Sequence, residues 1–286
     1  MELTAIYLIG LPAFLYVRAL RILNRRGLRV PWWQQTAWFA GLACIGVALL
    51  SPLDHLGDTD LVSAHMAQHL LIGDISAPLI LIGLRWPVYP FLLPRSMTAA
   101  IGRSKPMRRT LRFVKMPLVA AGLWLLILYG WHTAPAYEAA LRHPVLHAIQ
   151  HQSFVIGSIL VWLCVLEPNR ARVPGGLWKI AHITGVRFAG MFLGMAFVLV
   201  SHPFYAGFYG DRALKHGLTP NQDQGLAGAM MLGVDFVVMI GALVFFFLRS
   251  ADDADREERK EREELEALGQ PLPQSVPVRE TGVGLG

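Results

Sequence analysis

The chain has 286 residues, of which 54% are hydrophobic and 16% charged, and its mean hydropathy is +0.43. Soluble domains usually carry about 25% charged residues, so the composition excludes an ordinary soluble domain and indicates an integral membrane protein. The formal net charge of +6 is typical of cytoplasmic loops rich in Lys and Arg. It gives no reason to expect a nucleic-acid partner.

Seven apolar segments are long enough to cross a bilayer, which takes roughly 20 residues of helix. In chain order they cover about 3–20, 36–53, 61–84, 117–134, 144–166, 179–201 and 227–248. The sequence therefore predicts an all-α fold, a polytopic membrane helix bundle with seven transmembrane helices within residues 1–250.

Lys and Arg residues alternate strongly between the connections. The first, third and fifth connections hold sixteen of them, whereas the second, fourth and sixth hold three. Positive charge marks the cytoplasmic side, so the N-terminus is predicted outside and the C-terminus inside. Residues 251–286 are dense in both charges and then rich in Pro, which predicts a charged helical extension followed by a disordered cytoplasmic tail.

With this topology, nine of the ten histidines lie toward the outer side, and only His182 lies toward the cytoplasm. Two HxxxH pairs, His65 with His69 and His147 with His151, occur on different helices. The deeper member of each pair lies ~12 Å below the outer surface at 1.5 Å per residue. Facing helices would thus place four imidazoles around one ion, and imidazole suits copper, zinc, iron and nickel.

Other residues at similar depth could support such a site. His132 and His202 flank it at the outer ends of the fourth and sixth segments, and Met66, Met230 and Met231 offer soft ligands for Cu(I). Asp74 and Asp235 are candidates to orient ligand imidazoles, and an intramembrane carboxylate can also belong to an ion path.

Three further interpretations fit the same histidines and carboxylates. The HxxxH pairs could hydrogen-bond between helices without a ligand. They could serve as axial ligands in a membrane haem or metal redox enzyme. Asp74 and Asp235 could line the path of a copper or proton transporter, although the inner halves of the predicted helices carry few polar groups.

Four motifs occur in order over about residues 35–250: HMAQHLLIGDISAPLILIG, GWHTAPAYEAALRHPVLHAIQHQSF, SHPFYAGFYG and NQDQGLAGAMM. Together they resemble the multi-helix, caa3-type CtaG family of cytochrome c oxidase assembly factors. The resemblance implies a non-enzymatic, multi-pass protein of the bacterial plasma membrane. Such a protein would supply copper to cytochrome c oxidase subunits. The matching positions are His65, His69, His132, His147, His151, His202 and Asp223, of which the six histidines are the expected copper ligands.

Overall fold

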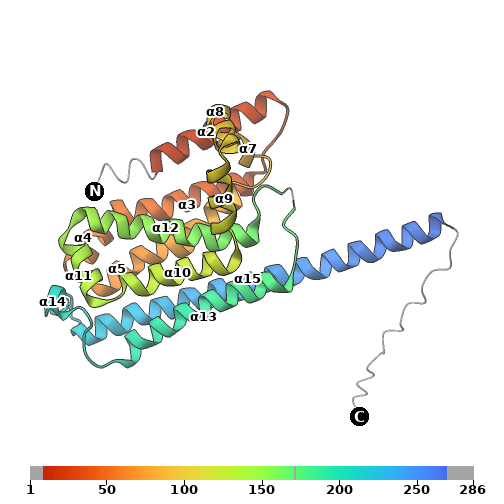
Figure 1. Cartoon of the computed structure of the whole chain (residues 1–286). Helices are drawn as coiled ribbons and strands as arrows, with labels where there is room; N and C mark the ends of the chain where they lie inside the picture. The colour runs from red at the N-terminus through yellow and green to blue at the C-terminus, as the bar shows by residue number, and fades with distance from the viewer. Residues whose placement is uncertain (1–8, 171, 269–286) are drawn as a thin grey trace, which may run out of the picture.

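The computed structural model describes residues 9–170 and 172–268. Every regular element within that part of the chain is a helix, which confirms the predicted all-α class. Figure 1 shows a bundle from which one long helix projects. The predicted disordered tail and the first residues of the predicted first span lie outside the described residues.

The helices follow one another with short connections. In chain order they are α2 (Leu11–Arg25), α3 (Trp32–Leu50), α4 (Pro52–Thr59), α5 (Val62–His69), the π-helix η2 (Leu70–Ile75), α6 (Ser76–Gly83), α7 (Tyr89–Leu92), α8 (Arg95–Arg103), α9 (Lys105–Val114), α10 (Pro117–Trp131), α11 (Ala134–Arg142), α12 (Pro144–Leu166), α13 (Leu177–Leu199), α14 (Ala206–Tyr209), the 3-10 helix η3 (Arg212–His216) and α15 (Pro220–Ala267).

Five of the described helices are long and apolar enough to cross a membrane. They are Trp32–Leu50, Val62–Gly83, Pro144–Leu166, Leu177–Leu199 and Pro220–Ala267. A sixth is obtained if α9 and α10, which meet at a bend of 75°, count as one span. The predicted segment at 3–20 corresponds to α2, whose 15 described residues are not among these spans. The chain is thus a multi-pass helical protein with five or six candidate spans.

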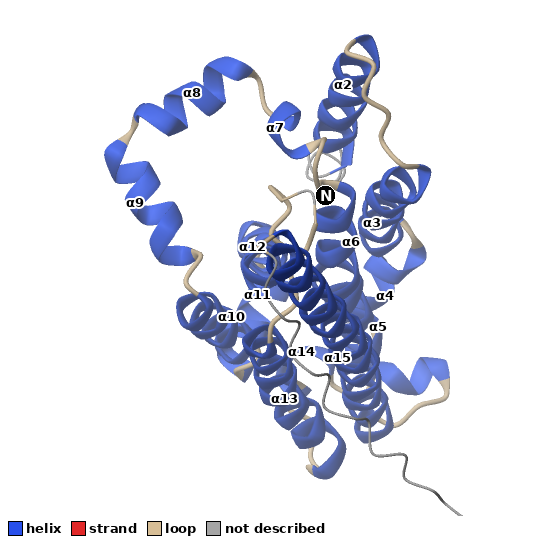
Figure 2. Ribbon diagram, turned by 90° about the vertical axis from the view of Figure 1, so that its right-hand side faces the viewer, coloured by secondary structure: helices blue, strands red, loops and turns tan. Residues whose placement is uncertain are grey.

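The spans that build the site pack side by side (Figures 1 and 2). α12 lies against α10 and against the helix formed by α5, η2 and α6, while α15 lies against α5 and along α13. α13 and α15 approach closely because glycines face each other, and a Cβ at Gly228 would lie 2.5 Å from the Gly194 carbonyl oxygen. Small residues permit such close approach between membrane helices.

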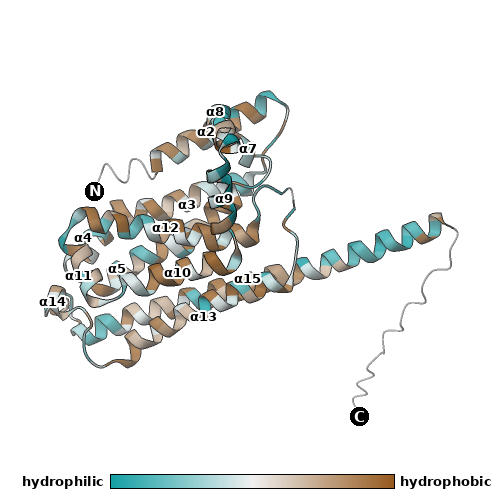
Figure 3. Cartoon of the chain, viewed as in Figure 1, coloured by the Kyte–Doolittle hydropathy of each residue, from teal (hydrophilic) through white to brown (hydrophobic). Residues whose placement is uncertain are grey.

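Two regions extend beyond the bundle. Figure 2 shows α8 and α9 arching away from it, and neither helix has a buried residue. The second region is the C-terminal part of α15. This helix begins at a capping box on Thr219 and runs for 48 residues. Figure 3 shows this helix changing from apolar within the bundle to hydrophilic beyond it.

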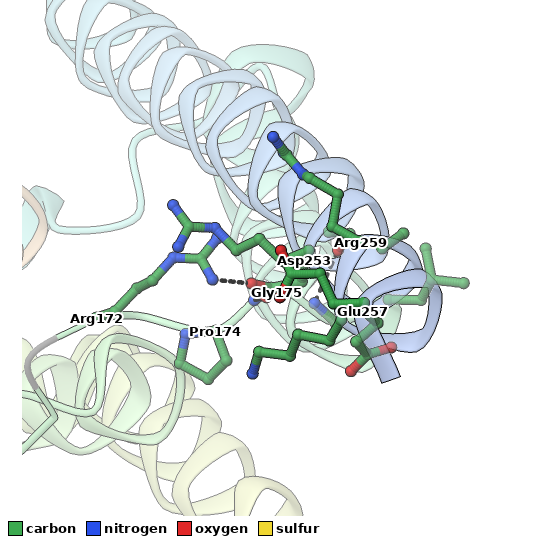
Figure 4. Close-up of a pocket in the computed structure, with 13 residues that line it drawn as sticks. Arg172, Pro174, Gly175, Asp253, Glu257 and Arg259 are labelled. Atoms are coloured by element: carbon green, nitrogen blue, oxygen red, sulfur yellow. Dashed lines mark hydrogen bonds and ion pairs between the residues drawn. The ribbon is translucent and has the colours of Figure 1, made fainter. Parts of the chain in front are cut away.

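The loop before α13 is attached to α15 where that helix leaves the bundle (Figure 4). Arg172 pairs with Asp252 at 2.7 Å and also with Asp253, and the Gly175 N–H donates to Asp253 at 2.6 Å. An open hollow of about 990 Å³ lies beside this attachment. Charges of both signs line it, so it is a salt-bridged surface beside the projecting part of α15.

Candidate metal centre

α5, which carries His65 and His69, begins at a cap supplied by another helix. The N–H groups of Val62 and Ser63 donate to the Asp223 carboxylate of α15 at 2.7 and 3.1 Å. Helix N-termini leave their first N–H groups unpaired and favour negative charge. The buried Asp223 therefore determines where α5 starts and how its histidines are presented.

The structure brings the two HxxxH pairs together. Ring centroids lie 4.4 Å apart for His65 and His69 on α5 and 4.2 Å apart for His147 and His151 on α12. Between the helices, the closest approaches are 5.2 Å from His65 to His147 and 5.3 Å from His69 to His151. All four side chains are buried, so the cluster is enclosed by the bundle.

Two overlapping sets of ligand atoms occur within the cluster. One nitrogen from each of His65, His69 and His151 lies within 4.8 Å of the others, as does one atom from each of Asp58, His65 and His147. The Asp58 Oδ1 atom is 3.6 Å from His147 Nε2 and 4.0 Å from His65 Nδ1. His65 belongs to both sets, and its imidazole has two nitrogens with which to do so.

Asp58 is a site residue that the sequence did not single out. It lies on α4, in the acidic connection that also holds Asp54 and lacks Lys and Arg. The absence of Lys and Arg from this connection was the feature of the sequence that could have pointed to Asp58 as a ligand for a cation. Burial and the neighbouring Asp54 carboxylate raise the pKa of Asp58 to about 7, so a cation reaching this group competes with a proton.

The cluster has few hydrogen bonds for its depth. Both ring nitrogens of His65 and His69, the Nε2 atoms of His147 and His151, and Oδ1 of Asp58 are buried without a hydrogen-bond partner. Roughly nine in ten buried polar groups have a partner, and an unsatisfied one costs about 1–3 kcal/mol. Each neutral imidazole offers one lone pair, so four such rings and a carboxylate that converge without hydrogen bonds to one another fit a cation.

Three tyrosines cover the cluster on the side of α14. The Tyr137 ring lies 5.0 Å from that of His65 and stacks on Tyr205 at 3.7 Å. The Tyr209 hydroxyl donates to the Gly57 carbonyl at 2.5 Å, which ties α14 to α4. The tyrosines were not predicted, although they lie in the quoted motifs GWHTAPAY and SHPFYAGFYG. They separate the imidazoles from the loop surface.

His132 lies beside the cluster at the end of α10. Its Nδ1 is 2.7 Å from the Leu128 carbonyl and its Nε2 is 3.4 Å from Met66 Sδ. The ring centroid is 6.2 Å from that of His69, and the Tyr205 hydroxyl donates to the His132 carbonyl at 3.0 Å. His132 thus borders the four imidazoles on the inner side of the tyrosines.

His202 does not join the cluster. Its side chain is exposed, and the neighbouring aromatic ring is that of Phe204, with a centroid distance of 5.7 Å. Neither set of ligand atoms includes it. Of the six predicted histidines, the structure therefore groups four, places His132 next to them, and leaves His202 at the surface.

The family model for the cytochrome c oxidase caa3 assembly factor matches residues 14–253. This range includes both HxxxH pairs, the tyrosines and the Asp223 cap. The chain belongs to the caa3 cytochrome c oxidase assembly factor family. None of the curated proteins and none of the solved structures matches the chain.

The assembly factor also contains a buried ion triad below the histidines. Arg187 of α13 contacts Asp74 of η2 and lies 3.0 Å from Asp235 of α15, and all three side chains are buried. Asp74 and Asp235 were predicted as candidates to orient imidazoles, whereas in this structure both carboxylates bind Arg187. Arg187 was missed, although a cation within an apolar segment calls for an acidic partner.

Proposed function

We propose that this assembly factor holds copper at the enclosed histidine cluster and supports its delivery to cytochrome c oxidase subunits, without catalysing a reaction itself. The observation that carries the proposal is the set of buried, unpartnered nitrogens on His65, His69, His147 and His151. Copper is here the cargo and not a resident cofactor. The family assignment supports the oxidase as the destination.

The donor set suits a copper ion in chemical terms. Neutral imidazole nitrogens bind first-row transition metals, and copper stands highest in the usual order of affinities. An ion at the cluster would supply the electron-pair acceptor that the buried nitrogens lack. The carboxylate of Asp58, 3.6 Å from His147, would add one negative charge on the outer side, where copper would enter.

The membrane setting is part of the proposal. We place the protein in the bacterial plasma membrane with seven spans, the N-terminus outside and the C-terminus inside. The alternation of basic connections supports this orientation. The membrane domain covers residues 1–250 and a cytoplasmic extension covers 251–286. The bend of 75° between α9 and α10 would lay the basic, amphipathic α9 along the inner membrane surface, where anionic lipids attract it.

A haem bound by the same histidines is the alternative. The cavity that borders His69 and His132 has a volume of about 30 Å³. This is room for one or two water molecules, whereas a porphyrin needs a slot many times larger. The purified protein is therefore expected to show no Soret band in its visible spectrum, and a strong Soret band would instead support the haem interpretation.

Complementation of a deletion strain tests the copper proposal. The wild-type gene should restore oxidase activity, whereas the double variant H69A/H151A should not, because it removes two of the converging imidazoles. The matched control is H55A, since the His55 side chain is exposed, and it should restore activity. Metal analysis of the purified proteins should find copper in the wild type and the control. Full rescue by the double variant, or no copper in the wild type after loading, would contradict the proposal.

A further inference from the structure

Met66 and His132 face each other in an unusual way. The Leu128 carbonyl can only accept a hydrogen bond, so the His132 Nδ1 that lies 2.7 Å from it carries the proton. In the neutral ring Nε2 then presents a lone pair. That lone pair points to Met66 Sδ at 3.4 Å, and a thioether sulfur has no hydrogen to donate. Two electron-pair donors thus meet with no hydrogen between them.

The two donors open onto a small cavity inside the bundle. Its volume is about 30 Å³, and its lining includes Met66, His69, His132 and Met231. Both ring nitrogens of His69 are buried without a hydrogen-bond partner. A second imidazole and a second thioether therefore border the same space as the facing pair.

Two carboxylates also line the cavity. Asp74 and Asp235 both belong to the lining, and both pair with the single guanidinium of Arg187. Two carboxylates against one cation give the triad a charge of −1 when both are ionised. In a low-dielectric interior, a monovalent cation in the adjoining cavity would be attracted by that charge.

We infer that Met66 and His132, together with His69, form a second copper position that is selective for Cu(I). This inference rests on the proposed copper handling. It adds an inner position with a sulfur ligand to the outer position, which consists of the histidine cluster and Asp58. Thioether ligands select Cu(I) over harder divalent ions. His69 borders both positions, so it can hand the ion from the outer to the inner one.

The spacing of the pair fits one ion. Metal–nitrogen and metal–sulfur bonds of ~2.0 and ~2.3 Å, as zinc makes them, would meet across the 3.4 Å separation at an angle of roughly 105°. That angle lies close to tetrahedral and slightly below trigonal values. The ion would lie off the line that joins Nε2 to Sδ, so both side chains would turn to share it, and His69 would supply the third ligand.

X-ray absorption of the full-length protein, loaded with Cu(I) under anaerobic conditions, tests the inference. The wild type should show a copper–sulfur scattering path. M66L should lose that path and bind Cu(I) at least about tenfold more weakly, since even an outer-shell partner is worth 10–100-fold. Leu matches Met in volume and is well tolerated in cores. M230L is the control, because Met230 packs against the same core outside the cavity lining, and it should keep the path.

The outcomes separate this inference from the proposed function. Copper bound with nitrogen and oxygen neighbours alone would overturn the inner position and leave the outer one standing. A copper–sulfur path that survives in M66L would also overturn it. A wild type that binds no copper would overturn the proposed function and the inference with it. An NMR titration of the wild type with Ag(I) gives a second test that needs no variant. Ag(I) should shift the methyl signal of Met66 and leave that of Met230 in place. The reverse result would contradict the assignment.

Discussion

Two buried polar clusters share the helix formed by α5, η2 and α6, but they differ in the partners that their side chains find. In the triad, Arg187 pairs with the carboxylates of Asp74 and Asp235 through Nη1 and so balances charge within the chain, while its Nε and Nη2 atoms have no hydrogen-bond partner. In the histidine cluster, His65 and His69 have ring nitrogens without any hydrogen-bond partner. A buried group that finds its partner within the fold stabilises the fold, whereas one left without a partner is available to a ligand. The comparison therefore separates a charge-paired cluster, which holds helices together, from a cluster of neutral imidazoles open to a ligand, although both border the same small cavity.

The largest expected effect comes from removing one member of the triad. R187L leaves Asp74 and Asp235 facing each other in the interior, and breaking a buried ion pair in this way costs about 3–5 kcal/mol. The measurement is the free energy of unfolding in detergent by SDS titration. Adding D74N and D235N to R187L should recover part of the loss, because no buried charge is then left unpaired. Wild-type stability of R187L alone would show that the triad is not structural.

An intermediate effect is expected at the cap that holds the histidine helix. D223N keeps one acceptor oxygen for Val62 or Ser63 and loses the negative charge at the α5 N-terminus. Hydrogen bonds to charged groups contribute about 1.5–3 kcal/mol, so a loss of about 1–2 kcal/mol is expected in the same titration. D211N is the matched control, because Asp211 is exposed and makes no side-chain hydrogen bond at the start of η3. Equal stability of D223N and the wild type would contradict the capping role.

The smallest effect on the metal-free protein is expected in the cluster. H65Q should lower the free energy of unfolding by about 1 kcal/mol, because ring contacts with Tyr137 and His147 are lost while no buried charge is left unpaired. With copper the difference should appear, since a ligand at 1,000 times its Kd stabilises the wild type by about 4 kcal/mol. H65Q should gain less from copper at the same concentration. A metal-free loss as large as that of R187L would remove the distinction between the two regions.

Local patterns in the sequence predicted the parts of the site that depend on one helix at a time. His65 with His69 and His147 with His151 follow from the i, i+4 spacing alone. The prediction that the two pairs lie at equal depth below the outer surface came from the predicted membrane topology. The partner of Asp74 could not be predicted in the same way, because Arg187 is 113 residues away and only packing shows which helices are neighbours. Asp58 was missed for the same reason, since a short helix outside the spans brings it to the imidazoles.

The π-helix η2 explains how one span serves two regions that face different helices. A π turn accommodates about one residue more than an α turn, and each residue of an α-helix rotates the following side chains by about 100°. The two ends of the helix at 62–83 are therefore out of phase with each other. His65 and His69 point to α12 before this shift, and Asp74, within it, points to α13. A deletion of one residue from LLIGDI would restore a regular phase, and only one of the two ends could then keep its neighbours.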